Sequence, residues 1–190
     1  TLITGGLGGL GLTVAEEMHK SFGARLALLS RTGLPDRQTW DDVVRRLGAE
    51  HIVAERISRV RALEALGAEV MLVEGDVTDV EQMERVTTAV RKRFGEINAV
   101  IHAAGAVNDE LIAVKIESDI EEVLAPKVYG TLVLENAVSS DQIDLFAVFS
   151  STSTWTAPIG QVDYVAANAF LNSFAESRWA RGDRAVVALN

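Results

Sequence analysis

The chain has 190 residues, 48% hydrophobic side chains and no cysteine, which predicts one well-buried domain over residues 1–190 and excludes disulfides and thiolate metal sites. A net charge of −9 argues against nucleic acid as a partner, because phosphate backbones are bound through clustered Lys and Arg. No apolar run reaches membrane-spanning length and no signal peptide is recognisable, so we expect a cytoplasmic protein with no membrane partner. We expect no metal site either.

The N-terminal stretch predicts a buried strand that runs into a glycine loop and then a helix. Glycines at positions 5, 9 and 11 allow a sharp turn, a close backbone approach to a pyrophosphate and tight packing of helix on strand. Free N–H groups and the positive end of the helix would face an anion. A turn that only needs left-handed backbone would use the same residues, so this alternative stays open.

The next elements complete a strand–helix–strand unit. A helix after Gly11 ends near Gly23, and residues 25–29 form a short apolar strand of the kind buried in a parallel sheet. Ser30 and Arg31 follow it, where a dinucleotide fold meets the adenosine ribose. The planar guanidinium of Arg31 suits a 2′-phosphate and predicts NADPH rather than NADH. The alternative is an arginine solvated at a strand end.

Residues 33–66 form a long connection in which residues 41–47 and 53–66 have helical periodicity. Its run of charges is interpreted as a solvated face rather than a binding patch. A strand over residues 69–74 follows. Asp76 would accept a hydrogen bond from an adenine amine, with Val77 beside the ring. Alternatively, Asp76 or Thr78 caps the helix that starts near Val80.

A helix over residues 80–94 precedes a fourth strand over residues 99–102. The Ala103-Ala104-Gly105 segment lets backbone pass close to a flat group. His102 could carry protons, but a histidine at the end of an apolar strand more often has a satisfied structural role, which we favour.

The last third of the chain predicts a helix containing Lys127, a strand over residues 145–149, a helix over residues 164–181 and a strand over residues 185–189. Alternating strands and helices of this kind predict an α/β fold. We therefore expect a Rossmann-type doubly wound parallel sheet with helices on both faces.

Four of these residues could reduce a carbonyl. Hydride addition leaves negative charge on oxygen, and Tyr164 could supply the proton. A tyrosine has an ordinary pKa of about 10, and the ammonium of Lys127 would favour the phenolate. Ser151 would hydrogen-bond the carbonyl oxygen, and Asn168 would hold a water or backbone link in a proton relay. Taken singly, Tyr164 is a half-buried helix residue and Ser151 a turn residue; together, at the ends of such strands, they favour catalysis.

Seven segments resemble the ketoreductase domain of modular polyketide synthases, within the short-chain dehydrogenase/reductase superfamily, and the match covers nearly the whole chain. They are Thr4-Gly5-Gly6-Leu7-Gly8-Gly9-Leu10-Gly11, Ser30-Arg31, Gly75-Asp76-Val77, His102-Ala103-Ala104-Gly105, Pro126-Lys127-Val128-Tyr129-Gly130, Phe149-Ser150-Ser151 and Gly160-Gln161-Val162-Asp163-Tyr164-Val165-Ala166-Ala167-Asn168-Ala169-Phe170-Leu171. In most members of the superfamily a lysine follows the tyrosine by four residues and an asparagine lies upstream. Here Asn168 follows Tyr164 and Lys127 lies upstream, an exchange typical of polyketide and related fatty acid synthase reductases.

The resemblance implies NADPH-dependent reduction of a β-ketoacyl thioester, carried as phosphopantetheine on an acyl carrier protein, to a β-hydroxyacyl product. It implies the catalytic set Lys127, Ser151, Tyr164 and Asn168. The residues assigned to cofactor binding are Thr4, Gly5, Gly6, Leu7, Gly8, Gly9, Leu10, Ser30, Arg31, Asp76, Val77, Ala103, Ala104 and Gly105. Other domains of the same synthase are expected partners.

Two departures from the family pattern bear on the interpretation. Ketoreductases that form the D-hydroxy product tend to carry Leu-Asp-Asp, where this chain has Val107-Asn108-Asp109 and keeps only Asp109 as a stereocontrol residue. The opposite class tends to carry tryptophan where this chain has Thr156, with Trp155 one place off, so we predict the D product. The chain also begins inside the first strand and ends inside the sixth. We therefore expect a fold truncated at both ends, a fragment of a larger multidomain chain that is weakly stable or inactive alone.

Three other functions remain open. A non-reducing structural or epimerising module would resemble this chain but lack a catalytic residue, and none is lost here. A fatty-acid-synthase-type β-ketoacyl reductase shares the exchanged lysine and asparagine. A free-standing reductase would be expected to have its lysine four residues after the tyrosine.

Overall fold

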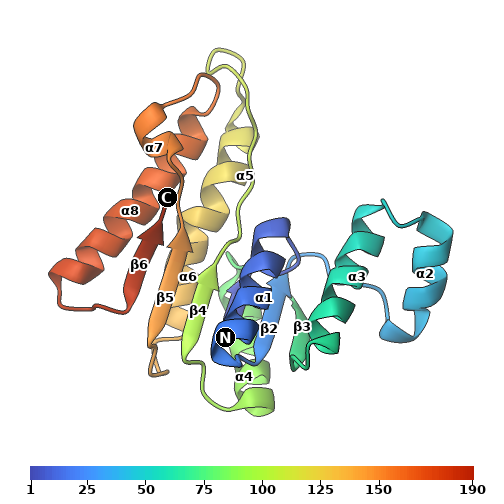
Figure 1. Cartoon of the computed structure of the whole chain (residues 1–190). Helices are drawn as coiled ribbons and strands as arrows, with labels where there is room; N and C mark the ends of the chain where they lie inside the picture. Colours follow the sequence, from blue (N-terminus) through green and yellow to red (C-terminus); the bar gives the residue numbers. More distant parts are fainter.

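Six parallel strands form the centre of the computed structural model, which describes residues 1–190 (Figure 1). The strands are β1 (Leu2–Thr4), β2 (Leu26–Ser30), β3 (Val70–Glu74), β4 (Ala99–His102), β5 (Leu145–Phe149) and β6 (Val186–Leu189). Their order is β3-β2-β1-β4-β5-β6, and the direction in which strands are added reverses between β1 and β4. This order confirms the predicted Rossmann-type sheet and places its ligand crevice beyond the carboxyl ends of β1 and β4.

Helices cover both faces of the sheet, as predicted. They are α1 (Gly9–Phe22), α2 (Trp40–Leu47), α3 (Ile52–Ala65), α4 (Val80–Phe94), α5 (Glu117–Lys127), α6 (Tyr129–Ala137), α7 (Ser153–Thr156) and α8 (Val162–Ala180), with a 3₁₀ turn η1 (Arg37–Thr39) before α2. Buried side chains of α1, α2 and α3 share one hydrophobic cluster, and those of α4, α6 and α8 share the other. None of the helices is long and apolar enough to cross a membrane.

The inner strands contribute to both clusters. Leu2 and Val100 pack on the side of α4, whereas Ile3 and Ile101 pack on the side of α1. Because successive side chains of a strand point to opposite faces, a strand covered on both sides is apolar at nearly every position. The nearly continuous apolar runs in the sequence therefore predicted these strands well.

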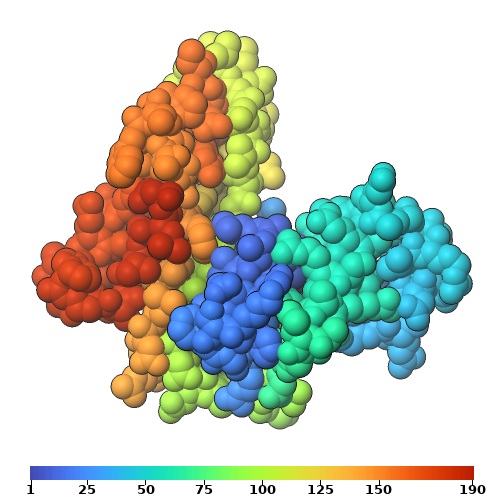
Figure 2. Space-filling model, in the orientation of Figure 1, coloured from blue at the N-terminus to red at the C-terminus, as the bar shows by residue number.

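The long connection between β2 and β3 forms a lobe beside the sheet, seen to the right of α1 in Figure 2. Trp40 is buried there, its indole N–H donates to the carbonyl oxygen of Pro35 at 2.8 Å, and the guanidinium groups of Arg37 and Arg61 lie 4.8 and 5.6 Å from its ring. These contacts hold α2 against α3. The two helices match the predicted segments to within a residue or two.

Several boundaries differ from the sequence interpretation. Helix α1 begins at Gly9 rather than after Gly11, and α8 begins at Val162, two residues before Tyr164. The helix expected around Lys127 is two helices, because the chain leaves regular α-helical geometry at Val128, two residues after Pro126. Proline lacks an N–H and crowds the turn before it, so Pro126 weakens the last turn of α5. The short helix α7 was not predicted.

Two glycines at the start of α1 provide a matched test of the loop geometry. A Cβ on Gly11 would lie 2.3 Å from the carbonyl oxygen of Gly5, whereas a Cβ on Gly9 would meet nothing within 4 Å. We expect Gly11→Ala to lower the free energy of unfolding by about 3 kcal/mol. Gly9→Ala should be neutral or stabilising by up to about 1 kcal/mol, because alanine favours the helix. Urea denaturation checks both, and equal effects of the two substitutions would contradict the packing argument.

Candidate active site

The glycine loop after β1 is held in a conformation that other residues could not adopt. Gly5 has a φ of +64°, and a Cβ there would lie 2.6 Å from the carbonyl oxygen of Ala103. The N–H of Gly6 donates to the carbonyl oxygen of Leu29 at 2.9 Å, which fixes the loop against β2. The left-handed turn and the close backbone approach therefore occur at the same loop, and the tight positions are Gly5, Gly6 and Gly11 rather than Gly9.

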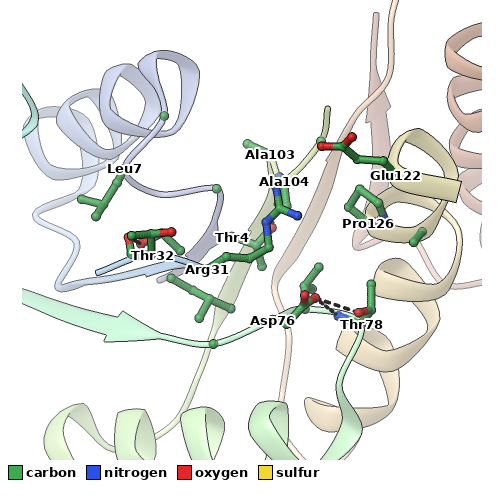
Figure 3. A pocket seen from close by; sticks show the side chains of 18 of the residues that line it. Thr4, Leu7, Arg31, Thr32, Asp76, Thr78, Ala103, Ala104, Glu122 and Pro126 are labelled. Atoms are coloured by element: carbon green, nitrogen blue, oxygen red, sulfur yellow. Dashed lines mark hydrogen bonds between the residues drawn. The ribbon is translucent and has the colours of Figure 1, made fainter. Parts of the chain in front are cut away.

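A pocket of about 420 Å³ opens beside this loop at the carboxyl ends of the strands (Figure 3). Most of the residues assigned to cofactor binding line it: Thr4, Gly5, Leu7, Gly8, Ser30, Arg31, Asp76, Val77, Ala103, Ala104 and Gly105. Gly6, Gly9 and Leu10 do not line it, and Leu10 is 48% exposed. One pocket thus joins residues that are far apart in the sequence, as the sheet order requires.

Further lining residues were not identified from the sequence. They are Leu29, Thr32, Arg56, Gly75, Thr78, Ser118, Glu121, Glu122, Ala125 and Pro126. Most charged side chains of residues 33–66 are exposed, as the interpretation of a solvated face expects, but Arg56 is an exception because its side chain is partly buried and lines this pocket. No local pattern indicated it: Arg56 directly precedes the buried Ile57, but the direction of its side chain depends on how α3 packs.

Arg31 and Asp76 have different surroundings in the pocket. Arg31 is exposed and makes no side-chain hydrogen bond or ion pair, and Figure 3 shows it extending across the pocket. One carboxylate oxygen of Asp76 accepts hydrogen bonds from the backbone N–H and the hydroxyl of Thr78, at 2.9 and 2.7 Å. Helix α4 is capped by Asp79, whose carboxylate accepts from the N–H of Gln82 at 2.9 Å. The suggestion that Asp76 or Thr78 caps α4 is therefore wrong.

His102 ties three elements together. Its Nδ1 lies 2.6 Å from the hydroxyl of Thr4 on β1, and its Nε2 lies 2.9 Å from the carbonyl oxygen of Pro126 in α5. Because a carbonyl oxygen only accepts, Nε2 carries the proton and Nδ1 accepts from Thr4. Burial, reinforced by the positive charge of Lys127, lowers the pKa of His102 to about 4, although the bond to Pro126 opposes this. A neutral imidazole with both nitrogens bonded fits the favoured structural role.

Lys127 follows Pro126 directly and is buried beside Tyr164. Its ammonium donates to the carbonyl oxygen of Phe149 at 2.8 Å and lies 5.7 Å from the centre of the Tyr164 ring. Burial lowers the pKa of Lys127 to about 8. A Cβ on Gly105 would lie 3.0 Å from the lysine Cε, so the glycine leaves room for the lysine stem.

Asn168 and Ser151 lie at the same end of the sheet. Asn168 is fully buried, its amide donates to the carbonyl oxygen of Tyr164 at 2.7 Å, and its side-chain oxygen has no partner. Ser150 donates to the backbone oxygen of Asn168 at 3.1 Å, which joins the end of β5 to α8. The hydroxyl of Ser151 accepts from the N–H of Ser153 at 3.1 Å. None of the four candidate catalytic side chains lines the pocket itself, but Lys127 lies directly behind two of its lining residues, next to Pro126 in the chain and against Gly105.

A buried ion pair that the sequence analysis missed fixes the loop after β4. The side chains of Lys115 and Asp163 are 0% and 1% exposed, and the ammonium lies 2.8 Å from the carboxylate. Lys115 also donates to the carbonyl oxygen of Asn108 at 2.6 Å. The neighbouring carboxylate of Asp109 accepts from the side chain of Gln161 at 3.0 Å. Asp109 is thereby held beside Gln161, which directly precedes α8 and lies three residues before Tyr164.

The strand order, the glycine loop and the pocket define a protein of the Rossmann-fold short-chain dehydrogenase/reductase class. A family model described as "KR domain" matches residues 1–189. The chain therefore belongs to the ketoreductase domain family of polyketide synthases, as the sequence resemblance predicted.

Relatives and solved structures agree with this membership. The chain is 39% identical to a 6-methylsalicylic acid synthase of Penicillium patulum over 97% of this chain and 10% of the relative. It is 38% identical to the polyketide synthase PksL of Bacillus subtilis over 93% of this chain and 4% of the relative. A crystal structure of an N-terminal ketoreductase from the macrolactin assembly line superposes with a TM-score of 0.83 at 35% identity, covering 100% of this chain and 36% of that one. The chain thus spans about a tenth or less of the length of these synthases.

His102 makes a prediction about stability at low pH. Between pH 6.5 and about 4 the unfolded chain binds a proton on His102 that the folded chain does not. The free energy of unfolding should therefore fall as the pH falls through this window, by about 3 kcal/mol from this residue alone. Urea denaturation at several pH values measures it, with His102→Gln as the comparison because glutamine does not titrate. If the free energy of unfolding changed equally with pH in the two proteins, His102 would not be a buried neutral imidazole in the folded chain.

Proposed function

We propose that the chain reduces a β-ketoacyl thioester, carried on the phosphopantetheine of an acyl carrier protein, to a β-hydroxyacyl thioester with NADPH. The observation that carries this proposal is the position of the Lys127 ammonium, 5.7 Å from the ring of Tyr164 and in contact with the Gly105 wall of the pocket. We take the cation, the phenol and the adjoining pocket as one site. Membership of the ketoreductase domain family supports the same reaction.

The pocket residues fit a phosphorylated dinucleotide. The glycine loop leaves the start of α1 open, since a Cβ on Gly9 would meet nothing within 4 Å, and exposed N–H groups of a helix start favour a pyrophosphate. Arg31, without a protein partner, is available to the 2′-phosphate, and Asp76 and Val77 would face the adenine. Bound NADPH would supply a hydride to the carbonyl carbon of the substrate.

Tyr164 would donate the proton that the substrate oxygen acquires. Lys127 would stabilise the phenolate that this donation leaves, because an ammonium close to a phenol favours its charged form. The lowered pKa of Lys127, about 8, means that the side chain keeps its charge at neutral pH and loses it in mildly alkaline solution. The cation is therefore present in the pH range where the proton transfer would run.

Ser151 and Asn168 would orient the reaction. The hydroxyl of Ser151 would donate to the substrate oxygen, the atom on which negative charge develops. The side-chain oxygen of Asn168 is buried without a partner and is available to hold a water molecule that returns a proton to the phenolate of Tyr164. Neither group needs to change its own charge, so both would act by position.

The same proposal covers partners and location. Because the synthase relatives are about ten times longer or more, we propose that other domains of one synthase surround this chain in the cytoplasm. The substrate would arrive on an acyl carrier protein. A non-reducing or epimerising module is the alternative, but Lys127, Ser151, Tyr164 and Asn168 are all present, which favours reduction. A fatty-acid-type reductase would use the same residues on a related substrate.

Tyr164→Phe and Lys127→Ala test the assigned chemistry. Loss of the proton donor should lower kcat by about a hundredfold or more. Lys127→Ala should also lower kcat strongly, since the other buried ammonium nearby, that of Lys115, is already paired with the carboxylate of Asp163. NADPH oxidation with a β-ketoacyl thioester, measured on the larger synthase that the proposal assigns to this chain, gives both values, and NADPH binding without substrate is the control for folding. Unchanged kcat in both variants would contradict the proposal.

Product analysis tests the proposed stereochemistry. Asp109 holds the last position of the pattern typical of D-forming ketoreductases, and its carboxylate lies against Gln161 beside the catalytic helix. We therefore expect mainly the D-hydroxyacyl product. Chiral chromatography of the product released from a β-ketoacyl thioester measures it. A predominance of the L alcohol would show that Asp109 does not set the facial choice.

A further inference from the structure

Arg56 projects from α3 into the pocket described above. The helix packs its buried residues Ala54, Ile57, Val60 and Leu63 against the sheet side, so Arg56 lies at the margin of that face. There it is partly buried and lines the pocket together with Arg31 and Thr32, which directly follow β2. The connection between β2 and β3 therefore contributes two guanidinium groups to the lining of the cavity.

The other arginines of α3 are engaged with the protein, whereas Arg56 is not. Arg59 donates to the carbonyl oxygen of Gly9 at 3.1 Å and to the hydroxyl of Thr13 at 3.0 Å. Arg61 forms an ion pair with Asp41. Arg56 makes no hydrogen bond or ion pair, and its Nε is buried without a partner. A buried N–H of a charged group without an acceptor is costly and indicates a missing acceptor.

The carboxylates that line the pocket come from other elements. Asp76 follows β3 and is already bonded to Thr78, and Glu121 and Glu122 belong to α5. None of them pairs with Arg31 or Arg56. Two free guanidinium groups therefore face a cavity with no protein anion bound to either.

We propose that Arg56 is a second binding residue, with Arg31, for the 2′-phosphate of the bound nucleotide. A phosphate monoester carries close to two negative charges near neutral pH and has three acceptor oxygens. Two planar guanidinium groups can divide those oxygens between them. The inference rests on the proposed function, because it requires NADP(H) rather than NAD(H) in this pocket.

Arg59 would hold α3, and with it Arg56, in a fixed position relative to the glycine loop. It lies three residues further along α3, and its bonds to Gly9 and Thr13 anchor the helix to the beginning of α1. The glycine loop that would hold the pyrophosphate and the helix that carries Arg56 are thus joined directly. The distance between a pyrophosphate and a 2′-phosphate in one nucleotide is limited, so this link favours simultaneous binding of both groups.

The test compares nucleotides that differ only in the 2′-phosphate. Dissociation constants are measured for NADPH and NADH by nucleotide fluorescence, and for adenosine 2′,5′-bisphosphate and AMP by calorimetry. The variants are Arg56→Met, Arg56→Lys and Arg31→Met. Arg46→Met is the matched control, because Arg46 is exposed on α2 and makes no side-chain hydrogen bond or ion pair, while the substitution removes the same charge.

Arg56→Met should raise the dissociation constants of NADPH and adenosine 2′,5′-bisphosphate by about ten- to a hundredfold, the usual effect of losing hydrogen bonds to a charged group. NADH and AMP should bind as in the wild type, which also shows that the variant is folded. The NADPH affinity of Arg56→Lys should lie between those of Arg56→Met and the wild type, and Arg46→Met should bind all four nucleotides as the wild type does.

The outcomes separate this inference from the proposed function. If the wild type prefers NADPH and Arg56→Met keeps that preference while Arg31→Met loses it, Arg56 is not a phosphate residue and only the inference is overturned. Equal weakening of NADPH and NADH by Arg56→Met would overturn it as well, since the residue would then be structural. If the wild type itself binds NADPH and NADH equally, both the proposed cofactor and the inference are wrong.

Discussion

The hydrogen bonds of His102 are the constraint on which the site depends. The imidazole joins Thr4, the last residue of β1, to Pro126 near the end of α5. Thr4 is paired with His102 across the sheet and directly precedes Gly5, whereas Pro126 directly precedes Lys127. One buried ring therefore connects the start of the glycine loop with the cation beside Tyr164. Because the ring is neutral and both of its nitrogens are bonded, the connection persists at physiological pH.

Lys127 shows how backbone geometry and electrostatics act together at this connection. The chain leaves α5 immediately after the lysine, so the side chain turns toward β5, where the carbonyl oxygen of Phe149 accepts from it. Gly105 leaves space for the lysine stem. Burial without a carboxylate partner disfavours the charged form of Lys127 and lowers its pKa to about 8. A cation held in this way is an effective electrostatic partner for a phenolate, because little water screens it.

The sequence predicted the sheet and most of the pocket because both follow from short-range patterns. Strands buried on both faces are apolar throughout, and the residues that follow them meet at one edge of a parallel sheet. Arg56 could not be placed in this way, since the rotation of α3 depends on how Trp40 and the rest of the connection pack. Asp79 rather than Asp76 caps α4, because both aspartates precede the helix and only the backbone geometry decides between them. Lys115 and Asp163 are 48 residues apart, and no local pattern predicts their contact.

That distant pair sets the position of a loop that has no regular structure of its own. The segment from residue 103 to residue 116 lies beyond the carboxyl end of β4. The Lys115 ammonium, between Asp163 and the carbonyl oxygen of Asn108, anchors it together with the backbone hydrogen bond from Glu110 to Gly160. Desolvating two charges offsets most of their attraction, so such a pair contributes little net stability. Loss of one partner, however, would leave the other charge buried alone at a cost of several kcal/mol. The pair therefore acts mainly on geometry: it ties the loop to α8, close to the place where Asp109 meets Gln161 at the start of the helix of Tyr164.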